Sequence, residues 1–526
     1  MYARETGRPP GPRILPSSLT CSDTSEGERT RPDDRAKSYR GTMKFLSEQP
    51  DVDLTYSDVF LVPRRSGITS RLEVDLAPAD GTPATIPLVA SNMNSVTGPR
   101  LAAVLARRGG IGILPQDMPL QDLDAAIRTV KAQPVAWDAP LVLSPAATVA
   151  DALRLIPAVS GQGIVVAEGS GRIEASAVRG ILPASRLATA LPDAQLGDLV
   201  HAGAPALDAE DAAEARSAFD VITSTGAELV TVVDHGHLVG TLSARSALRA
   251  TLYAPAVDPQ GRLAVGAAVG INGDVAAKAR ALAAAGVDVL VVDTAHGHQE
   301  GMLRALATVS ALELGIPIVA GNIVTADGVD DLVAAGASIL KVGVGPGAMC
   351  TTRMMTAVGR PQFSAVLETA EAAKAAGAHV WADGGVRYPR DVALALAAGA
   401  ASVMIGSWFA GTIEAPGQLQ ADADGRIYKE SWGMASTKAV QARFGRLDAY
   451  ERARKELFAE GISSSRIYLD PLRPGVEDLL DMITSGVRSS FTYAGASSVP
   501  EFHDRAVVGR QSAAGYEEGK ALPVSW

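Results

Sequence analysis

A cysteine in a glycine-rich loop is the feature of this sequence best suited to chemistry. Residues 343–353 read GVGPGAMCTTR and place Cys350, one of only two cysteines, at the tip of the loop. The glycines let the backbone take positive φ values and approach a ligand or ion closely. An exposed thiol in such a loop suits a nucleophile. A free cysteine is more often buried as a small hydrophobe, but the polar run Thr351-Thr352-Arg353 does not line a core. We therefore interpret Cys350 as a nucleophile.

The elements that must position this loop form a regular pattern from about residue 263 onward. Short apolar runs alternate there with alanine-rich helical stretches, which is typical of a parallel sheet covered on both faces. The runs are 264–269, 287–293, 316–320, 339–344, 379–382 and 402–405, with three more at 54–62, 87–90 and 110–114. This count predicts an α/β fold of the (β/α)₈, or TIM-barrel, type. The alternative is a Rossmann-type open sheet, but no GxGxxG opens a helix after an early strand.

Polar and glycine residues follow several of these runs. They are Asp293, Gly321-Asn322, Asp383-Gly384-Gly385 and Gly406-Ser407. In a barrel of this type, functional groups gather at the carboxyl ends of the strands. We therefore expect these residues and the Cys350 loop to meet in one site, with Met354 and Met355 packed behind the loop.

Residues 119–262 interrupt the pattern and contain two similar units. In the first, 142–156 is followed by 163–167 and 176–187; in the second, 206–222 is followed by 229–234 and 238–248. Each unit predicts helix, strand, strand and helix, which favours a tandem repeat inserted in the barrel over two unrelated segments. We thus divide the chain into a disordered extension (1–42), an N-terminal barrel segment (43–118), the insert (119–262), a C-terminal barrel segment (263–515) and a C-terminal tail (516–526).

Composition limits the classes of function. The chain has 526 residues and a net charge of −10, and it lacks a basic stripe with interleaved aromatics, which argues against a nucleic-acid partner. Two cysteines cannot build a disulfide framework, so a reducing cytoplasm is the expected setting. No apolar run reaches the ~20 residues of a membrane span, and we expect no membrane partner. His296 and His298 lack a further ligand at zinc-site spacing.

With these motifs assembled, the chain closely resembles the IMP dehydrogenase/GMP reductase family over residues 50–515. The matching stretches are LTYSDVFLVPRRSGITSRLEVDL (54–76), VASNMNSV (89–96), RGGIGILPQDM (108–118), VVDTAHGH (291–298), AGNIVT (320–325), GVGPGAMCTTR (343–353), ADGGVRYPRDV (382–392), MIGSWFAGTIEAPG (404–417), EGI (460–462) and GVRSSFTYAGA (486–496). The repeat in residues 119–262 resembles the tandem CBS (Bateman) modules typical of IMP dehydrogenases, which sense purine nucleotides.

The resemblance implies a set of site residues. Cys350 would attack C2 of the purine, with Thr352 and Glu460 as the proton-shuttling pair of a reductase. Asp383 would hold the ribose hydroxyls. The remaining nucleotide contacts would be Ser91, Asn92, Met93, Gly384, Gly385, Gly406, Ser407, Met434 and Ser436. The nicotinamide cofactor would meet Asp293, Thr294, Ala295, Asn322, Gly343 and Gly345. Carbonyls of Gly345, Gly347 and Cys350 would ring a monovalent cation, K⁺.

The choice between the two branches of the family rests on the flap, residues 437–461. Dehydrogenases of the family activate water with an Arg-Tyr dyad there, whereas this flap contains no Arg-Tyr dipeptide and offers only Arg443-Phe444. The segments 62–76 and 354–366 and residue Asn92 also resemble reductases. The CBS insert and the segments 293–298 and 406–417 resemble dehydrogenases. Because water activation has to happen in the flap, we give it more weight.

The resulting hypothesis is an NADPH-dependent reductive deamination of GMP to IMP and ammonia. One alternative is an IMP dehydrogenase that forms XMP with NAD⁺ and uses Arg443, Arg446 or Arg452 as a substitute base. Another is a non-catalytic purine-nucleotide sensor, although a sensor has no need of Cys350. The resemblance also implies ATP or GTP at the CBS modules and a homotetramer or homo-octamer.

Overall fold

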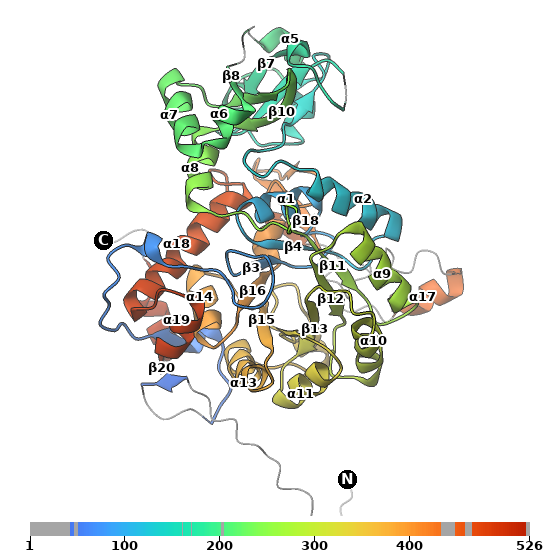
Figure 1. Ribbon diagram of the computed structural model, residues 1–526, viewed down its shortest axis with the longest axis vertical. Coiled ribbons are helices and arrows are strands. Elements are labelled where there is room, and N and C mark those ends of the chain that lie inside the picture. The colour runs from blue at the N-terminus through green and yellow to red at the C-terminus, as the bar shows by residue number, and fades with distance from the viewer. Residues whose placement is uncertain are drawn as a thin grey trace, which may run out of the picture. The chain divides into compact units, whose positions relative to one another are not determined.

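The computed structural model describes residues 43–46, 51–159, 161–169, 171–200, 203, 205–432, 448–457 and 465–521. Within these ranges, eight parallel strands close into a barrel in the order β11-β12-β13-β14-β15-β16-β3-β4 (Figure 1). The predicted (β/α)₈ barrel is therefore confirmed. Its strands are β3 (Leu88–Ala90), β4 (Ile111–Leu114), β11 (Gly266–Val269), β12 (Val289–Asp293), β13 (Ile318–Ile323), β14 (Ile339–Val342), β15 (His379–Asp383) and β16 (Ser402–Ile405).

Helices follow the strands and surround them (Figure 1). They are α1 (Pro99–Arg107), α2 (Leu120–Lys131), α9 (Val275–Ala285), α10 (Glu300–Ser310), α11 (Ala326–Ala334), α12 (Thr352–Thr356), α13 (Gln362–Ala375), α14 (Pro389–Ala397), α15 (Ser407–Ala410), α18 (Val476–Ala494), α19 (Val499–Arg505) and α20 (Ala513–Glu518). Local sequence sets their ends: the Asp274 side chain caps α9, and Gly286, at φ 97°, ends it.

The barrel interior is apolar at its base. A buried cluster there includes Val89, Ile111, Val291 and Trp381, each fully buried. The indole N–H of Trp381 donates to Asp80 at 2.8 Å, so this large side chain leaves no buried donor unpaired. A packed base of this kind holds the strands in fixed register and lets their carboxyl ends present side chains at defined positions.

One predicted barrel strand lies elsewhere. Residues 54–62 form a capped turn, Tyr56–Asp58, followed by β2 (Val59–Leu61). This strand pairs antiparallel with β20 (Val507–Arg510), which also pairs with β1 (Lys44–Phe45), in a separate sheet. Phe60 and Leu61 are only half-buried, whereas the barrel strands β3 and β16 are buried throughout. The C-terminal boundary also differs, because α20 continues past residue 516.

Two units with the same strand pairing fill residues 142–252. The first contains β5 (Val142–Leu143), α3 (Val149–Leu153), β6 (Gly163–Ala167), β7 (Val178–Pro183), α4 (Ala184–Leu187) and α5 (Leu196–Leu199). The second contains β8 (Ala206–Asp208), α6 (Ala209–Ala213), α7 (Ala215–Thr225), β9 (Val230–Asp234), β10 (His237–Leu242) and α8 (Ala244–Leu252). In each, the middle strand pairs parallel with the first and antiparallel with the third. Each unit has its own apolar cluster.

The start predicted for the insert, residue 119, lies one helix too early. Helix α2 follows β4 directly and buries one apolar face. Lys131 is the last residue of α2, and its ammonium lies 2.8 Å from a carboxylate oxygen of Asp258 and 2.7 Å from one of Asp288. Asp288 directly precedes β12. The Lys131 side chain is only 6% exposed. A charge buried this deeply needs its partners, so α2 belongs to the barrel.

A second buried network connects α8 to the barrel helix α18. The guanidinium of Arg249, 8% exposed, contacts Glu477 at 3.0 Å, Asp478 at 2.6 Å and Asp481 at 2.7 Å. Arg108, after α1, contacts the other oxygen of Glu477 at 2.6 Å. Burial alone would raise the pKa of Glu477, but Arg108 and Arg249 outweigh it and hold that pKa well below its usual range. Glu477 is therefore ionised and shared between two segments.

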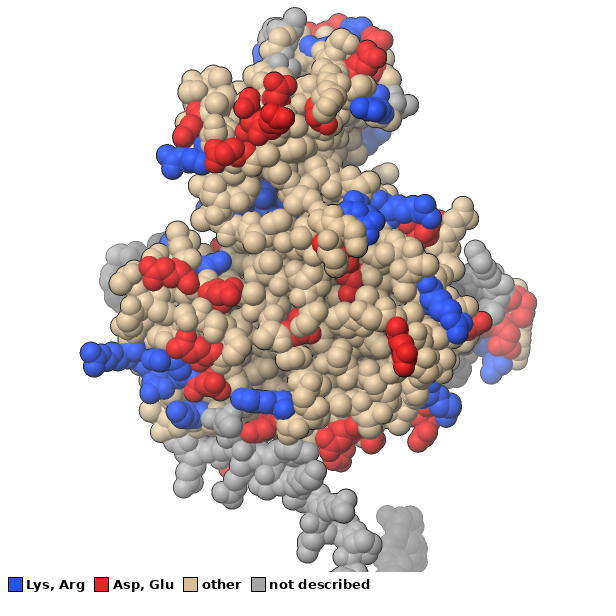
Figure 2. Space-filling model, in the orientation of Figure 1, with Lys and Arg blue, Asp and Glu red and all other residues tan. Residues whose placement is uncertain are grey.

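Charged side chains of both signs are scattered over the face of the molecule shown in Figure 2. Over most of that face Lys or Arg lie near Asp or Glu, although several Asp and Glu side chains gather on its upper part. Among the described helices, none is both long enough and apolar enough to cross a membrane.

The Glu477 network predicts a pH-dependent loss of stability. We expect Glu477→Gln to lower the free energy of unfolding at neutral pH by about 3 kcal/mol, because two buried guanidinium groups lose a shared anion. The folded pKa lies below the unfolded value of about 4.3. The wild-type advantage is thus complete above that value and shrinks as pH falls toward the folded pKa. Urea unfolding at neutral and acidic pH measures both effects.

The matched control is Glu300→Gln, since the Glu300 side chain is 85% exposed. This variant should differ from wild type by less than about 0.5 kcal/mol at either pH. An equal loss in both variants, or a loss at Glu477 that does not depend on pH, would contradict the assignment.

Candidate active site

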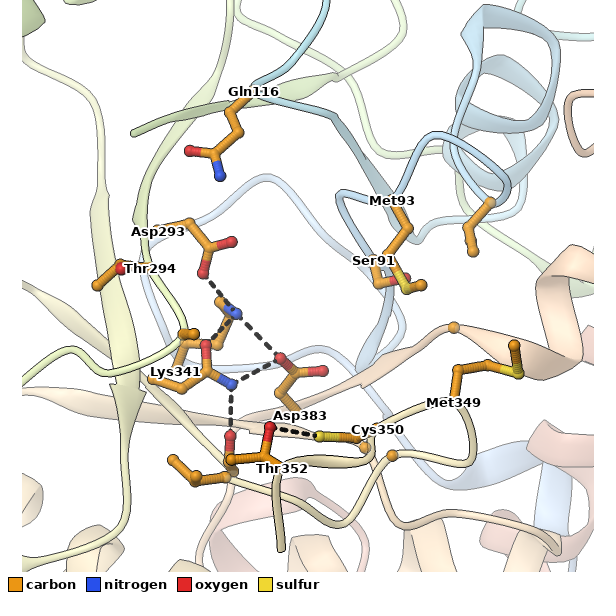
Figure 3. A pocket seen from close by; sticks show the side chains of 18 of the residues that line it. Ser91, Met93, Gln116, Asp293, Thr294, Lys341, Met349, Cys350, Thr352 and Asp383 are labelled. Carbon is orange, nitrogen blue, oxygen red and sulfur yellow. Dashed lines mark hydrogen bonds and ion pairs between the residues drawn. The ribbon is translucent and has the colours of Figure 1, made fainter. Parts of the chain in front are cut away.

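A cavity of about 630 Å³ opens at the carboxyl ends of the barrel strands. Figure 3 shows it from close by, with side chains from different strands pointing toward one another. Of the predicted site residues, the following line it: Ser91, Met93, Asp293, Thr294, Ala295, Asn322, Gly343, Gly345, Gly347, Cys350, Thr352, Asp383, Gly384, Gly385, Gly406 and Ser407. The residues that follow the strands and the Cys350 loop therefore meet around one cavity, as expected from the sequence.

The Cys350 thiol lies on the loop between β14 and α12 and is exposed. Its sulfur lies 3.3 Å from the hydroxyl oxygen of Thr352. The backbone N–H of Cys350 donates to the carbonyl of Gly347 at 3.0 Å, which folds the loop back on itself. A thiol held beside a hydroxyl at the edge of a cavity can attack a bound electrophile while a proton donor stands close to it.

The loop is held against β15 by a close approach of backbone. A Cβ atom on Gly343, at φ 150°, would lie 2.2 Å from the carbonyl oxygen of Asp383. Only glycine fits there, so the Cys350 loop and the strand end that carries Asp383 are packed together. Gln362 reinforces this contact, because its amide donates to the carbonyls of Val342 at 2.7 Å and Asp383 at 3.2 Å.

A buried lysine occupies the centre of the site. Lys341, in the middle of β14, has a side chain only 4% exposed. Its ammonium forms an ion pair with Asp293 at 2.8 Å and donates a hydrogen bond to Asp383 at 2.9 Å and another to the side-chain oxygen of Asn322. Burial alone would lower the pKa of Lys341, but the carboxylates of Asp293 and Asp383 outweigh it, and the pKa is raised. Lys341 is therefore a fixed positive charge.

Asn92 is the exception among the predicted contacts. Its side chain is buried, and its amide donates to Asp293 at 2.8 Å, so it supports a carboxylate and does not line the cavity. Ser91, its neighbour, does line it: within the described part of the chain, its hydroxyl oxygen is buried without a hydrogen-bond partner and lies next to Gly406. Among the described residues, Ser91 thus offers a polar group for a ligand.

Several residues that line the cavity were not assigned to the site from the sequence, among them Lys341, Gln116 and Lys278. Lys341 carried a signal, since a charged residue inside the apolar run ASILKVGV demands buried partners. Gln116 has a buried side-chain oxygen without a partner among the described residues. Lys278, on α9, donates to the backbone carbonyl of Gln116 at 2.6 Å, and burial lowers its pKa. Both residues line the wall with Gly270 and Asp274, on the side of β4 and β11. Gln116 lies in the matching stretch 108–118, which was not read as part of the site, and no motif marked Lys278.

Other predictions fall outside the site or outside the described residues. Met434, Ser436 and Glu460 lie outside the described residues. Met354 and Met355 do not pack behind the loop: they are 89% and 62% exposed, because the short helix α12 buries none of its residues. His298 pairs with Asp331 at 2.7 Å. Across the ranges that the structure describes, no three His, Cys, Asp or Glu side chains are grouped so that they could hold a metal ion.

The chain is similar to GMP reductases and IMP dehydrogenases over most of its length. The GMP reductase of Mycobacterium tuberculosis is 55% identical over 489 residues, which cover 92% of this chain and all of that protein. The GMP reductase of Leishmania donovani is 36% identical over 90% of this chain and 97% of its own. The IMP dehydrogenase of Aquifex aeolicus is 35% identical over 88% of this chain and 94% of its own.

A solved structure agrees with these relatives. It is a cysteine-to-alanine variant of GMP reductase from Trypanosoma brucei in complex with guanosine 5′-monophosphate, with a TM-score of 0.63 and 31% identity. The match covers 91% of this chain and 99% of that one.

The family described as IMP dehydrogenase / GMP reductase domain matches residues 53–521. The sequence-based prediction of an enzyme that resembles GMP reductase is thereby confirmed. On this match and these identities, the chain is a member of the IMP dehydrogenase/GMP reductase family.

Proposed function

We propose that the protein converts GMP, NADPH and a proton into IMP, ammonia and NADP⁺. The observation that carries the proposal is the exposed Cys350 thiol, 3.3 Å from the Thr352 hydroxyl, at a cavity that Asp383 also lines. Relatives at 55% identity that are named GMP reductase support this direction of the reaction.

In the proposed chemistry, the Cys350 sulfur adds to C2 of the purine and a C–S bond forms. The C2 amine then leaves as ammonia after Thr352, supported by Glu460, passes it a proton. A covalent adduct between Cys350 and the purine remains. Hydride addition at C2 followed by cleavage of the C–S bond returns the thiolate and releases IMP. Atoms balance, because the hydride replaces the amine.

Nucleotide binding would use the strand ends that line the cavity. Asp383 would accept hydrogen bonds from the ribose hydroxyls. The turns at Gly384-Gly385 and Gly406-Ser407 would offer backbone amides to the 5′-phosphate. The unpartnered hydroxyl of Ser91 beside Gly406 supports a polar ligand group at this place. Met434 and Ser436 would complete the contacts to the base and phosphate.

The cofactor would occupy the region of the cavity lined by Asp293, Thr294, Ala295, Asn322, Gly343 and Gly345. The cavity extends from there to Gly270 and Asp274, where the unpartnered oxygen of Gln116 is available to an amide or hydroxyl donor. These residues fit a polar, extended ligand. NADPH bound there would supply the hydride.

A monovalent cation would be held by the backbone carbonyls of Gly345, Gly347 and Cys350. The Gly347 carbonyl accepts a hydrogen bond from Cys350 and keeps a second lone pair for an ion. Potassium there would stiffen the loop that carries the nucleophile.

We further propose that the two units of residues 142–252 are CBS modules that bind ATP or GTP and regulate the barrel, and that the chain acts in the cytoplasm as a homotetramer or homo-octamer. The repeated strand pairing in the two units supports a tandem origin.

The direction of the reaction is tested by the ultraviolet absorbance of the reduced nicotinamide. With potassium present, we expect NADPH to be consumed with GMP, and no NADH to form from IMP and NAD⁺. Formation of NADH alone would overturn the proposal in favour of a dehydrogenase. Confirmed nucleotide binding with no turnover in either assay would favour a sensor.

The nucleophile is tested by Cys350→Ala. We expect turnover to fall by at least roughly a thousandfold, because the covalent path is lost, while GMP binding measured by calorimetry persists. The matched control is Cys21→Ala, which changes the other cysteine of the chain and should leave turnover unchanged. Normal turnover in the Cys350 variant would exclude the covalent mechanism.

The regulatory role is tested by replacing residues 140–240 with a short Gly-Ser linker. This cut keeps Lys131 and Arg249. Their loss would leave the carboxylates of Asp288 and Glu477 in the barrel without these cationic partners. We expect GMP turnover to be retained and the effect of ATP or GTP on the rate to disappear. A folded variant without activity, or a full-length chain that does not respond to either nucleotide, would contradict the proposal.

A further inference from the structure

The two carboxylates at the centre of the site are held differently. Both oxygens of Asp293 have protein partners: Oδ2 accepts from Asn92 at 2.8 Å, and Oδ1 lies 2.8 Å from the Lys341 ammonium. In Asp383, by contrast, both donors contact the same oxygen. Lys341 donates to Oδ2 at 2.9 Å, and so does the amide of Asn322.

This arrangement gives the Asp383 carboxylate a fixed orientation. Its side chain is 22% exposed, and Figure 3 shows its second oxygen pointing away from Lys341. With Oδ2 held by two donors, Oδ1 is the oxygen that remains for a ligand in the cavity. A ligand with hydroxyl groups then meets an acceptor that is already oriented, so little ordering is required on binding.

Lys341 itself has little freedom. It projects from the buried strand β14, and its ammonium contacts Asp293 and Asn322 in addition to Asp383. Gly321 packs closely against the base of this side chain, because a Cβ on Gly321 would lie 2.7 Å from the Cβ of Lys341. The ammonium is thus a rigid point of attachment for Asp383.

Proton transfer and covalent attack are poor roles for this lysine. An ammonium that contacts two carboxylates loses its proton with difficulty, and the Lys341 ammonium lies against Asp293, Asp383 and Asn322. Its contacts all serve to hold other side chains.

We propose that Lys341 is a positioning residue that, together with Asn322, holds Asp383 so that Oδ1 alone faces the ribose hydroxyls of the bound nucleotide. Asp293 anchors the lysine, and its own oxygens are already occupied. The inference rests on the proposed function, because it takes GMP as the ligand of Asp383.

The test compares GMP with 2′,3′-dideoxyguanosine 5′-monophosphate, which lacks both hydroxyls. Hydrogen bonds to a charged group favour the hydroxyl-bearing ligand by roughly tenfold or more each, so wild type should bind GMP more tightly by at least that factor. In Lys341→Met, we expect this ratio of affinities to fall toward one. Titration calorimetry measures this ratio. A general loss of folding would weaken the binding of both ligands equally and leave the ratio of their affinities unchanged.

The matched control is Lys374→Met, since the Lys374 side chain is 63% exposed, and its ratio should equal that of wild type. Lys341→Met leaves the two half-buried carboxylates of Asp293 and Asp383 without their cation. If it does not fold, the Lys341→Met/Asp293→Asn pair restores the net charge of the cluster and leaves Asp383 unchanged. The same fall in ratio is expected there.

The outcomes separate the two proposals. Wild type that binds GMP with a large ratio, combined with a Lys341 variant that keeps this ratio, would overturn the positioning role and leave the proposed function standing. Wild type that fails to bind GMP would overturn the proposed function, and the inference with it.

Discussion

The site is organised by one electrostatic constraint: the ammonium group of a lysine side chain that is only 4% exposed lies in the wall of the cavity, among the barrel strands. A charge buried to this degree is tolerated only with anions and acceptors around it. Lys341 meets that demand with groups from β12, β13 and β15, two of which are the strands on either side of its own. The requirement therefore ties together strand ends that are distant in sequence, and the Cys350 loop begins directly after the strand that carries Lys341.

The barrel could be predicted because its strands have a simple signature. Buried parallel strands are continuous apolar runs, and a long series of these between helices leaves few alternatives. The segment 54–62 has a similar composition, but its strand pairs with β20 in a separate sheet. A run of apolar residues does not reveal which sheet a strand joins. Helix α2 was assigned to the insert for a related reason: the partners of Lys131, Asp258 and Asp288, lie more than a hundred residues further along the chain.

The site could be predicted where chemistry depends on residues at strand ends. Cys350, Asp383 and the glycine turns were located in this way, and the structure brings them to one cavity. Lys341 was overlooked because its role depends on neighbours in space. Asn92 was assigned to the substrate from its position in a motif. That position does not reveal that the side-chain amide already donates to Asp293.

The strand pairing at the entrance to the repeated units has a mechanical consequence. The backbone of Asp138 exchanges hydrogen bonds with Thr241 at 2.8 and 3.0 Å, so the chain leaves and re-enters at one point. The intervening residues are thereby closed into a loop whose ends are already joined. Such a loop can grow, shrink or be exchanged with little cost in chain entropy to the barrel. Described contacts between this loop and the barrel include the ion pair of Arg107 with Asp138 and the ion pairs of Arg245 and Arg249 with carboxylates of α18.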